Sequence, residues 1–275
     1  MPGLNPVIVI TGATGAIGSA TAALLARRQA RLLLLSRPSD RLDALVARLD
    51  RDNRVSSVEV DLSSLASVRA AARQIARTVP HVDVLLNVAA MYTPEYEKSD
   101  DGFELMLATN HLGPFLLTNL LRDRLAGAGR VITVSAPSST RVDFDQLLSK
   151  EQFRALRTFG ATKAASLMFT FELARRAKRW DVRAYAFHPG LVRSDLMREA
   201  PRPIQYLTRL VSRPPDRAAE DLADLATSPA FASTTGWFFK GGRRIDPPKS
   251  TLDASSQGEL WRRSAELVEL GDVGF

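Results

Sequence analysis

The sequence predicts an α/β protein built on a doubly wound parallel sheet, and three observations support this fold class. Short runs of β-branched residues or leucine alternate with longer amphipathic segments, the pattern of strands joined by crossover helices. The runs are apolar almost throughout, as in strands covered by helices on both faces. The chain of 275 residues is long enough for one continuous core, and no repeat, low-complexity tract or linker divides it. We therefore expect residues 1–275 to form a single domain.

The expected strands are short apolar runs, from Val-Ile-Val-Ile at the first to Trp-Phe-Phe at the last. They cover residues 7–10, 32–35, 55–60, 82–88, 131–135, 182–187 and 237–239. The segments between them carry apolar residues at helical spacing, with charged residues at the outer positions. We expect helices at 17–28, 40–49, 63–78, 102–125, about 159–179, 215–226 and about 257–270.

Two long stretches do not fit this alternation. Residues 136–158 follow the fifth strand, and residues 191–214, which are rich in proline, follow the sixth. Loops of this length in a compact domain are usually functional. Both leave the carboxyl ends of strands, where open α/β sheets bind their ligands. We expect both stretches to be substrate-binding insertions.

The composition excludes several classes of protein. Without cysteine, the chain has no thiol catalysis, Cys-ligated zinc, iron–sulfur cluster or disulfide, and its three histidines share no metal-ligand spacing. The net charge of +7 comes mostly from arginines spread along the chain, which indicates a solvated surface and no nucleic-acid partner. No apolar stretch approaches the ~18 residues of a membrane span. We expect a cytoplasmic protein with no metal and no membrane partner.

A glycine-rich turn follows the first strand and opens the first helix. The segment reads Thr11-Gly-Ala-Thr-Gly-Ala-Ile-Gly18. Glycines allow a tight turn and close approach to a pyrophosphate, whose charge meets the N–H groups and positive dipole end of the helix. The turn predicts a Rossmann-like dinucleotide site, although a tight strand-to-helix turn without a ligand is the alternative. The expected contacts are Gly12, Thr14, Gly15, Ala16 and Ile17.

The residue after the second strand predicts the type of dinucleotide. Sites that prefer NAD place an acidic residue there, against the ribose 2′-hydroxyl. This chain has Arg37, which can form a charge-assisted pair with a 2′-phosphate. We therefore expect the cofactor to be NADPH. The alternative is one more surface arginine.

Further motifs, in the same order along the chain, resemble the short-chain dehydrogenase/reductase family, and the resemblance covers essentially the whole sequence. They are Val60-Asp-Leu62, Leu86-Asn-Val-Ala-Ala90, Thr109-Asn-His-Leu-Gly113 and His188-Pro-Gly-Leu-Val-Arg-Ser194. The segments Gly236-Trp-Phe-Phe and Leu260-Trp-Arg-Arg-Ser are similar to the retinol-dehydrogenase-like branch. The resemblance implies cofactor contacts from Asp61, Leu62, Asn87, Ala89, Pro189, Gly190, Val192 and Ser194.

The family's catalytic motif is altered. The family carries Tyr-x-x-x-Lys after the fifth strand, and here the corresponding segment reads Phe159-Gly-Ala-Thr-Lys163. Ala136, after Ser135, stands where the family has its catalytic serine. Lys163 lies on the same helix face as Phe159 and can still bind the nicotinamide ribose, but Phe159 has no hydroxyl to protonate an alkoxide. The glycine turn, with Ala16, looks more like that of the family's extended members.

The resemblance implies catalytic roles for Lys163 and for Asn110, the family's active-site asparagine, which we expect to bridge backbone and water. Ser138, Ser139 and Thr158 are alternative hydroxyls for the missing acid. The expected substrate-binding residues are Ser135, Ala136, Phe159, Tyr92 and Tyr206.

Three functions remain open: a reductase, a non-redox enzyme on the same scaffold, and a cofactor-binding pseudoenzyme. The cofactor contacts are retained at both ends of the site, which favours the reductase. A ketone beside a phenol could use its own hydroxyl to stabilise the alkoxide. In this respect the chain resembles the atypical, Tyr-lacking ketoreductases that tailor angucyclinone antibiotics. The resemblance implies a small-molecule partner, an aromatic polyketide ketone, and leaves the oligomeric state open.

Overall fold

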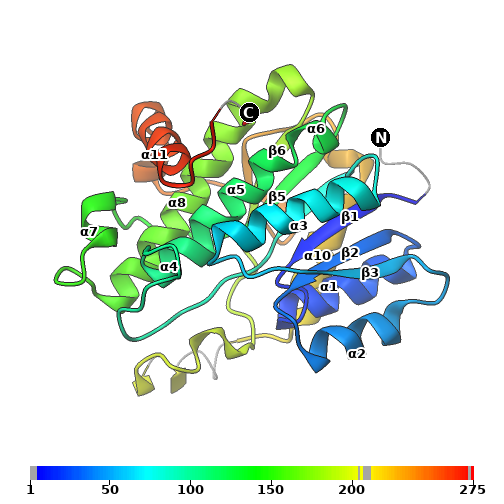
Figure 1. Ribbon diagram of the computed structural model, residues 1–275, viewed down its shortest axis with the longest axis horizontal. Helices are drawn as coiled ribbons and strands as arrows, with labels where there is room; N and C mark the ends of the chain where they lie inside the picture. The colour runs from blue at the N-terminus through cyan, green and yellow to red at the C-terminus, as the bar shows by residue number, and fades with distance from the viewer. Residues whose placement is uncertain (1–4, 204, 207–211, 272–273) are drawn as a thin grey trace.

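The computed structural model describes residues 5–203, 205–206, 212–271 and 274–275, and it confirms the α/β fold class. Eight strands form one sheet in the order β3-β2-β1-β4-β5-β6-β7-β8, with only the β7–β8 pair antiparallel (Figure 1). The strands are β1 (Val7–Thr11), β2 (Arg31–Ser36), β3 (Val55–Glu59), β4 (Val84–Asn87), β5 (Arg130–Val134), β6 (Arg183–Phe187), β7 (Trp237–Lys240) and β8 (Arg243–Ile245). The seven expected strands are present, and β8 is an addition.

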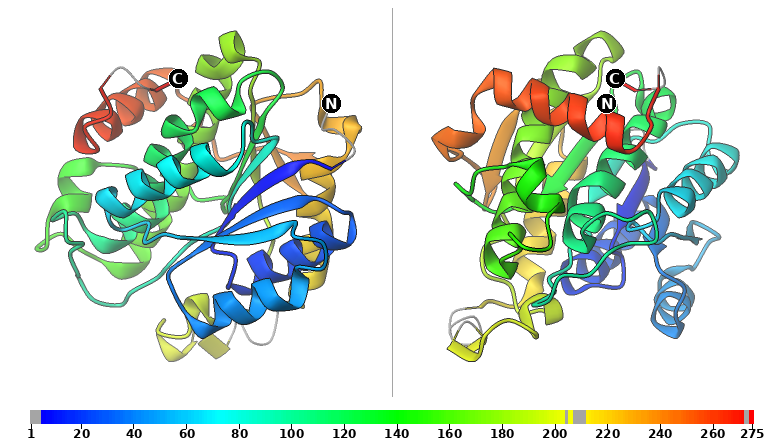
Figure 2. Two further views of the ribbon diagram at one scale, coloured as in Figure 1. Left: turned by 45° about the vertical axis from the view of Figure 1, so that its right-hand side comes forward. Right: turned by 60° about the vertical axis from the view of Figure 1, so that its left-hand side comes forward.

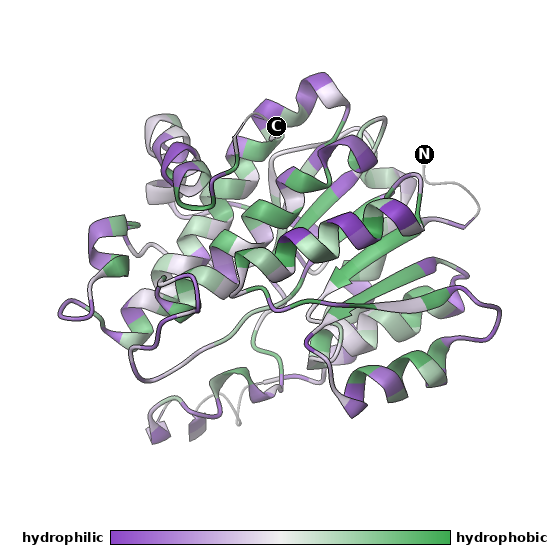
Figure 3. Cartoon of the chain, in the orientation of Figure 1, coloured by the Kyte–Doolittle hydropathy of each residue, from purple (hydrophilic) through white to green (hydrophobic). Residues whose placement is uncertain are grey.

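Helices cover both faces of the sheet. One face carries α1 (Ala16–Arg27), α2 (Asp40–Leu49) and α10 (Pro215–Thr227); the other carries α3 (Leu65–Thr78), α5 (Gly113–Leu120) and α8 (Ala155–Arg176). The period of two along β1 explains the layers, because Val7 and Val9 join the core under α3, α5 and α8, whereas Ile8 and Ile10 join the core under α1 and α10. Figure 3 shows the apolar strands between helices whose outer surfaces are hydrophilic.

A further helix, α11 (Ala254–Leu267), lies across the outside of α8 (Figure 2). Its Trp261 is buried and packs on the rings of Phe115 and Phe169. His111 bonds to Ser264 of this helix through Nε2 at 2.7 Å. The helix therefore completes the core on that side of the sheet.

The segment expected as one helix over 102–125 is interrupted. It consists of α4 (Leu105–Leu107), a π-helical turn (Ala108–Leu112), α5 and α6 (Arg122–Leu125). A Cβ on Gly113 would lie 2.2 Å from the carbonyl oxygen of Leu62, so this helix approaches the loop after β3 as closely as a glycine permits. Such π turns are frequent at functional sites.

A buried arginine holds the far end of α10. Arg130 of β5 is 1% exposed, and its Nη1 donates to the carbonyl oxygens of Leu225, Ala226 and Ser228 at 3.1, 3.0 and 2.9 Å. A cation at this position satisfies carbonyl groups that the helix leaves without intrahelical partners.

The two predicted insertions have different structures. Residues 136–158 contain a short helix, α7 (Phe144–Leu148), before α8 begins. Residues 191–214 are closed at their base, where Arg213 N donates to Leu191 O and Arg193 N donates to Arg213 O, both at 2.9 Å. We call residues 193–212 the lobe; positions 204 and 207–211 lie outside the described residues. Within the described part of the chain, no helix is long and apolar enough to cross a membrane.

Candidate functional site

The glycine turn between β1 and α1 is packed against the loop after β4. Gly12 has φ +66°, and a Cβ there would lie 2.7 Å from the Cα of Ala89, so a glycine is required on both grounds. Gly15 N donates to Gly12 O at 3.0 Å, which closes the turn. No described side chain caps α1 at Gly15, so the N–H groups of its first turn are free for an anionic ligand.

The ends of β2 and β3 lie beside this turn. Thr14 Oγ1 and Ser36 Oγ are 2.9 Å apart, which ties the turn to β2. Arg37 is exposed, and its guanidinium has no partner among the described residues. The Asp61 carboxylate accepts hydrogen bonds from the N and Oγ of Ser63 at 2.8 and 2.6 Å. Arg37 is therefore the cation available to an anion at this end of the site.

Asn87 ends β4 in a buried position. Its Nδ2 donates to Thr118 Oγ1 at 3.2 Å, but its buried Oδ1 has no partner within the described structure. Native proteins rarely leave such an acceptor unpaired. Thr11 Oγ1 accepts from the backbone N of Val88 and Ala89 at 3.1 and 3.3 Å, so β1 holds the loop in place. An orphaned acceptor close to the free N–H groups at the start of α1 is a feature expected of a dinucleotide site.

Lys163 of α8 is a buried cation without a hydrogen-bond acceptor in the described structure. The residue is 7% exposed, and desolvation lowers the pKa of its ammonium to about 8. The Nζ atom lies 5.4 Å from the centre of the Phe159 ring, one helical turn earlier. Ser135 Oγ donates to Lys163 O at 2.8 Å, so this hydroxyl is used in fixing β5 to α8. The Lys163 ammonium therefore fits the hydroxyl groups of a bound ribose.

The side-chain amide of Asn110, in the π turn, is hydrogen-bonded to the protein backbone and does not face the candidate site freely. Its Nδ2 donates to Met91 O at 2.9 Å, and Met91 N donates to its Oδ1 at 2.8 Å. The same Nδ2 lies 3.2 Å from Thr162 Oγ1, next to Lys163. Asn110 thus joins the loop after β4 to α8 and positions both. In the described structure the amide is fully used in these bonds, so it acts on Lys163 only by positioning the neighbouring Thr162.

An apolar cluster lies beside Phe159, built from the loop after β4, helix α4, the segment before α8, the start of α8 and the lobe. Tyr92 packs edge to face on Phe159, with ring centres 5.8 Å apart. The other members of the cluster are Met91, Met106, Phe153, Ala155, Leu196, Met197 and Ala200. We call this the aromatic–methionine cluster. The sequence indicated only Tyr92 and Phe159, because the other members come from short or separate elements that only the fold brings together.

The remaining predicted substrate and acid residues have varied surroundings. Ser138 Oγ donates to Thr140 Oγ1 at 3.2 Å, and a Cβ at Gly160 would lie 2.6 Å from that Thr140 oxygen. This pair therefore packs against the backbone next to Phe159. Thr158 is buried, Ala136 is half-buried, and Ser139, Ser194 and Tyr206 are exposed.

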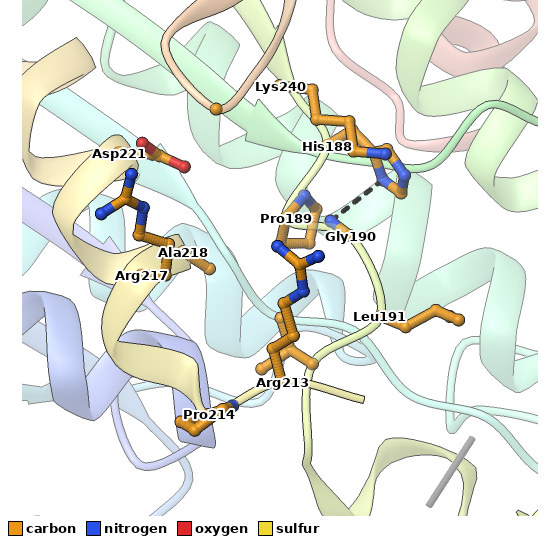
Figure 4. Close-up of a pocket in the computed structure, with 12 residues that line it drawn as sticks. His188, Pro189, Gly190, Leu191, Arg213, Pro214, Arg217, Ala218, Asp221 and Lys240 are labelled. Carbon is orange, nitrogen blue, oxygen red and sulfur yellow. Dashed lines mark hydrogen bonds between the residues drawn. The ribbon is translucent and has the colours of Figure 1, made fainter. Parts of the chain in front are cut away.

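A cavity of about 550 Å³ opens beside the loop after β6 (Figure 4). Pro189, Gly190 and Val192, which are predicted cofactor contacts, line it on one side. The side chains of Arg213, Arg217, Asp221 and Lys240 reach its rim from the base of the lobe, α10 and the end of β7. Burial lowers the pKa of His188, whose Nδ1 accepts from Gly190 N at 3.4 Å. The sequence analysis did not single out the charged residues of this cavity.

The arrangement of sheet, glycine turn and buried lysine agrees with the comparison to known proteins. Residues 6–204 match the family model of the short chain dehydrogenase. The chain belongs to the short-chain dehydrogenase family. It is accordingly an oxidoreductase of that family by descent, and the resemblance of its motifs is confirmed at this level.

Relatives of this short-chain dehydrogenase come from different biological contexts. Human retinol dehydrogenase 14 is 34% identical over 297 residues, which cover 98% of this chain and 88% of the human protein. DnrU of Streptomyces sp. (strain C5), the proposed daunorubicin C-13 ketoreductase, is 34% identical, with coverage of 95% and 92%. A crystal structure of a protein from Mycobacterium paratuberculosis has a TM-score of 0.78 at 29% identity and covers 97% of this chain and 96% of its own.

Proposed function

We propose that the protein is an NADPH-dependent ketoreductase that acts on a ketone of a polycyclic aromatic polyketide by an atypical mechanism. The observation that carries the proposal is the buried Lys163 ammonium, which has no described hydrogen-bond acceptor and stands beside Phe159 at the edge of the aromatic–methionine cluster. A desolvated cation is costly unless a ligand meets it. A ribose there would bring the hydride donor beside an apolar substrate site.

The cofactor half of the proposal is supported by groups that lack partners. These are the N–H groups of the first turn of α1, the Oδ1 of Asn87 and the guanidinium of Arg37. Arg37 would meet a 2′-phosphate, which is why we propose NADPH over NADH. NADPH supplies a hydride when bound; the chain's own residues hold it and shape the site.

The substrate half is supported by the aromatic–methionine cluster. Flat aromatic rings pack well against aromatic edges and polarizable thioethers, and unbranched methionines adapt to a bulky ligand. The similarity to DnrU favours a ketone of an aromatic polyketide. The similarity to retinol dehydrogenase 14 makes a retinoid the competing substrate.

Charge on the carbonyl oxygen must be met where it develops. Phe159 cannot meet it, because its ring has no hydroxyl. A hydroxyl beside the ketone on the substrate itself can donate an intramolecular hydrogen bond to the developing alkoxide. General acid catalysis is worth about 10² to 10⁴ in rate, and positioning together with such a donor can replace it.

The test is NADPH oxidation, followed by absorbance together with product mass, against a set of matched substrates. We expect turnover of a polycyclic aromatic ketone with a neighbouring hydroxyl, less turnover of its methyl ether, and none of a simple ketone. Faster turnover of retinal would favour the retinoid. A product formed without NADPH consumption would identify a non-redox enzyme. Tight NADPH binding without turnover of any substrate would identify a pseudoenzyme.

Phe159→Tyr provides a matched gain-of-function check. If Phe159 occupies the position of an acid, the new hydroxyl lies one helical turn from Lys163 and should allow turnover of simple ketones. Unchanged selectivity in this variant would contradict that position.

A further inference from the structure

Tyr92 is largely buried, but its hydroxyl reaches the surface of the described structure and has no hydrogen-bond partner there. The residue is 7% exposed and stands in the loop after β4. Its ring meets the Phe159 ring edge to face, at 81° between planes and 5.8 Å between centres. A hydroxyl that no protein group occupies is free to bond a ligand. Because the Tyr92 ring belongs to the aromatic–methionine cluster, it carries an accessible hydroxyl beside Phe159, which has none.

Two other tyrosines of the chain use their hydroxyls structurally. Tyr96 donates to Leu148 O at 3.1 Å, and Tyr185 donates to Thr234 O at 2.8 Å. Tyr206 is 69% exposed. Among the described tyrosines, Tyr92 is thus the largely buried one whose hydroxyl is not used by another residue.

The position of Tyr92 is fixed by the residues that fix Lys163. Asn110 holds both backbone groups of Met91, the residue before Tyr92, and also contacts Thr162, the residue before Lys163. The loop after β4 and helix α8 therefore share one anchor. This anchor fixes the position of Tyr92 relative to Lys163, with the Phe159 ring between their side chains.

We propose that the Tyr92 hydroxyl donates a hydrogen bond and then the proton to the ketone oxygen, in place of the hydroxyl that is absent at Phe159. This inference rests on the proposed ketoreductase function. In the step, the carbonyl carbon gains a hydride from NADPH, and the C=O π pair moves to oxygen. The oxygen takes the proton of Tyr92, and the tyrosinate recovers one from water.

Tyr92 and the substrate's own hydroxyl can act together. An alkoxide oxygen has lone pairs for more than one donor, so the neighbouring substrate hydroxyl and Tyr92 can bond it at the same time. Burial raises the pKa of Tyr92, so the phenol keeps its proton at neutral pH and stays a donor. The two donors predict a larger effect of losing Tyr92 when the substrate hydroxyl is blocked.

The test compares Tyr92→Phe with the control Tyr96→Phe, each assayed with the hydroxylated ketone and with its methyl ether. Tyr92→Phe should lower kcat by about 10²-fold, in the range of general acid catalysis, with KM and NADPH binding nearly unchanged. The loss should be larger on the methyl ether, whereas Tyr96→Phe should behave as wild type. The hydroxyl of Tyr92 has no described partner, so removing it should leave the unfolding midpoint unchanged.

The outcomes separate the two proposals. If the wild type reduces the ketone and Tyr92→Phe does so with the same kcat, this inference is overturned and the proposed function stands. Failure of the wild type to oxidise NADPH with any ketone would overturn both. A double variant, Tyr92→Phe with Phe159→Tyr, should recover activity lost in the single variant. A structural role for Tyr92 would instead lower stability or NADPH binding, and no rescue would follow.

Discussion

Replacing Lys163 with methionine should stabilise the protein while abolishing cofactor-dependent turnover. Burial lowers the pKa of Lys163 to about 8, from about 10.4 for a free lysine. A group whose pKa is lowered on folding binds its proton better in the unfolded chain, so it opposes folding wherever the lysine is charged in both states. At about 1.4 kcal/mol for each factor of ten, the penalty is about 3 kcal/mol at pH 7. Methionine has a similar length and no charge, so it removes this penalty.

The pH dependence gives the sign of the effect. The penalty is fully present below about pH 8, the pKa of the folded lysine. It disappears as the pH rises towards the pKa of the lysine in the unfolded chain, so about 1 kcal/mol remains at about pH 9.5. We would measure urea unfolding by the fluorescence of the three tryptophans at both pH values. Lys163→Met should exceed wild type in stability at pH 7 and approach it at the higher pH.

The exposed Lys98 offers a matched control, because Lys98→Met removes a solvated charge and should change stability by no more than about 0.5 kcal/mol. A Lys163→Met protein no more stable than wild type at pH 7 would refute the reasoning. So would a gain of the same size at both pH values, because desolvation of the ammonium would then not be its cause.

Three further changes test other parts of the structure. Arg37→Glu should move the preference from NADPH towards NADH by at least about tenfold in kcat/KM, since a charge-assisted hydrogen bond is worth roughly 1.5–3 kcal/mol; equal discrimination in the variant would exclude a 2′-phosphate contact. Gly12→Ala places a Cβ 2.7 Å from the Ala89 backbone at positive φ, so calorimetric titration with NADPH should show greatly weakened binding, and wild-type affinity would contradict the close approach. Arg130→Met leaves three carbonyl groups without their donor, each worth about 1–3 kcal/mol if it stays buried, so urea unfolding should show a loss of about 3 kcal/mol or more; a loss below about 1 kcal/mol would mean that the end of α10 does not depend on Arg130.

Most of the sheet was predictable because its strands, apart from β3, are apolar runs too short for a helix of ordinary length. Helix α2 begins and ends at the predicted residues, and its Ser39 cap explains the sharp start. The antiparallel β8 was missed, because Arg243-Arg-Ile245 is neither apolar nor alternating and pairs only through the turn from β7.

Features of the candidate site could be predicted from the sequence where the backbone geometry requires one residue type. They could not be predicted where they depend on which hydrogen-bond partners the fold brings to a side chain. Gly12 stands at a position that excludes a Cβ, so its signal is local. The sequence could not show the π turn around Asn110 or its bonds to Met91 and Thr162, because these partners are 19 and 52 residues away in the chain. Nor could it show that the Ser135 hydroxyl is used by the Lys163 carbonyl, since the partner is 28 residues away.

The closed base of the lobe has a consequence for how such proteins diverge. Two backbone hydrogen bonds between Leu191, Arg193 and Arg213 bring the ends of the lobe together at the edge of the sheet. Backbone bonds do not depend on side-chain identity, so residues between these ends can be exchanged or lengthened without moving β6 or α10. The lobe supplies Leu196, Met197 and Ala200 to the aromatic–methionine cluster. The composition of this cluster can therefore be changed by exchanging the lobe for that of a relative, while β6 and α10 keep their positions.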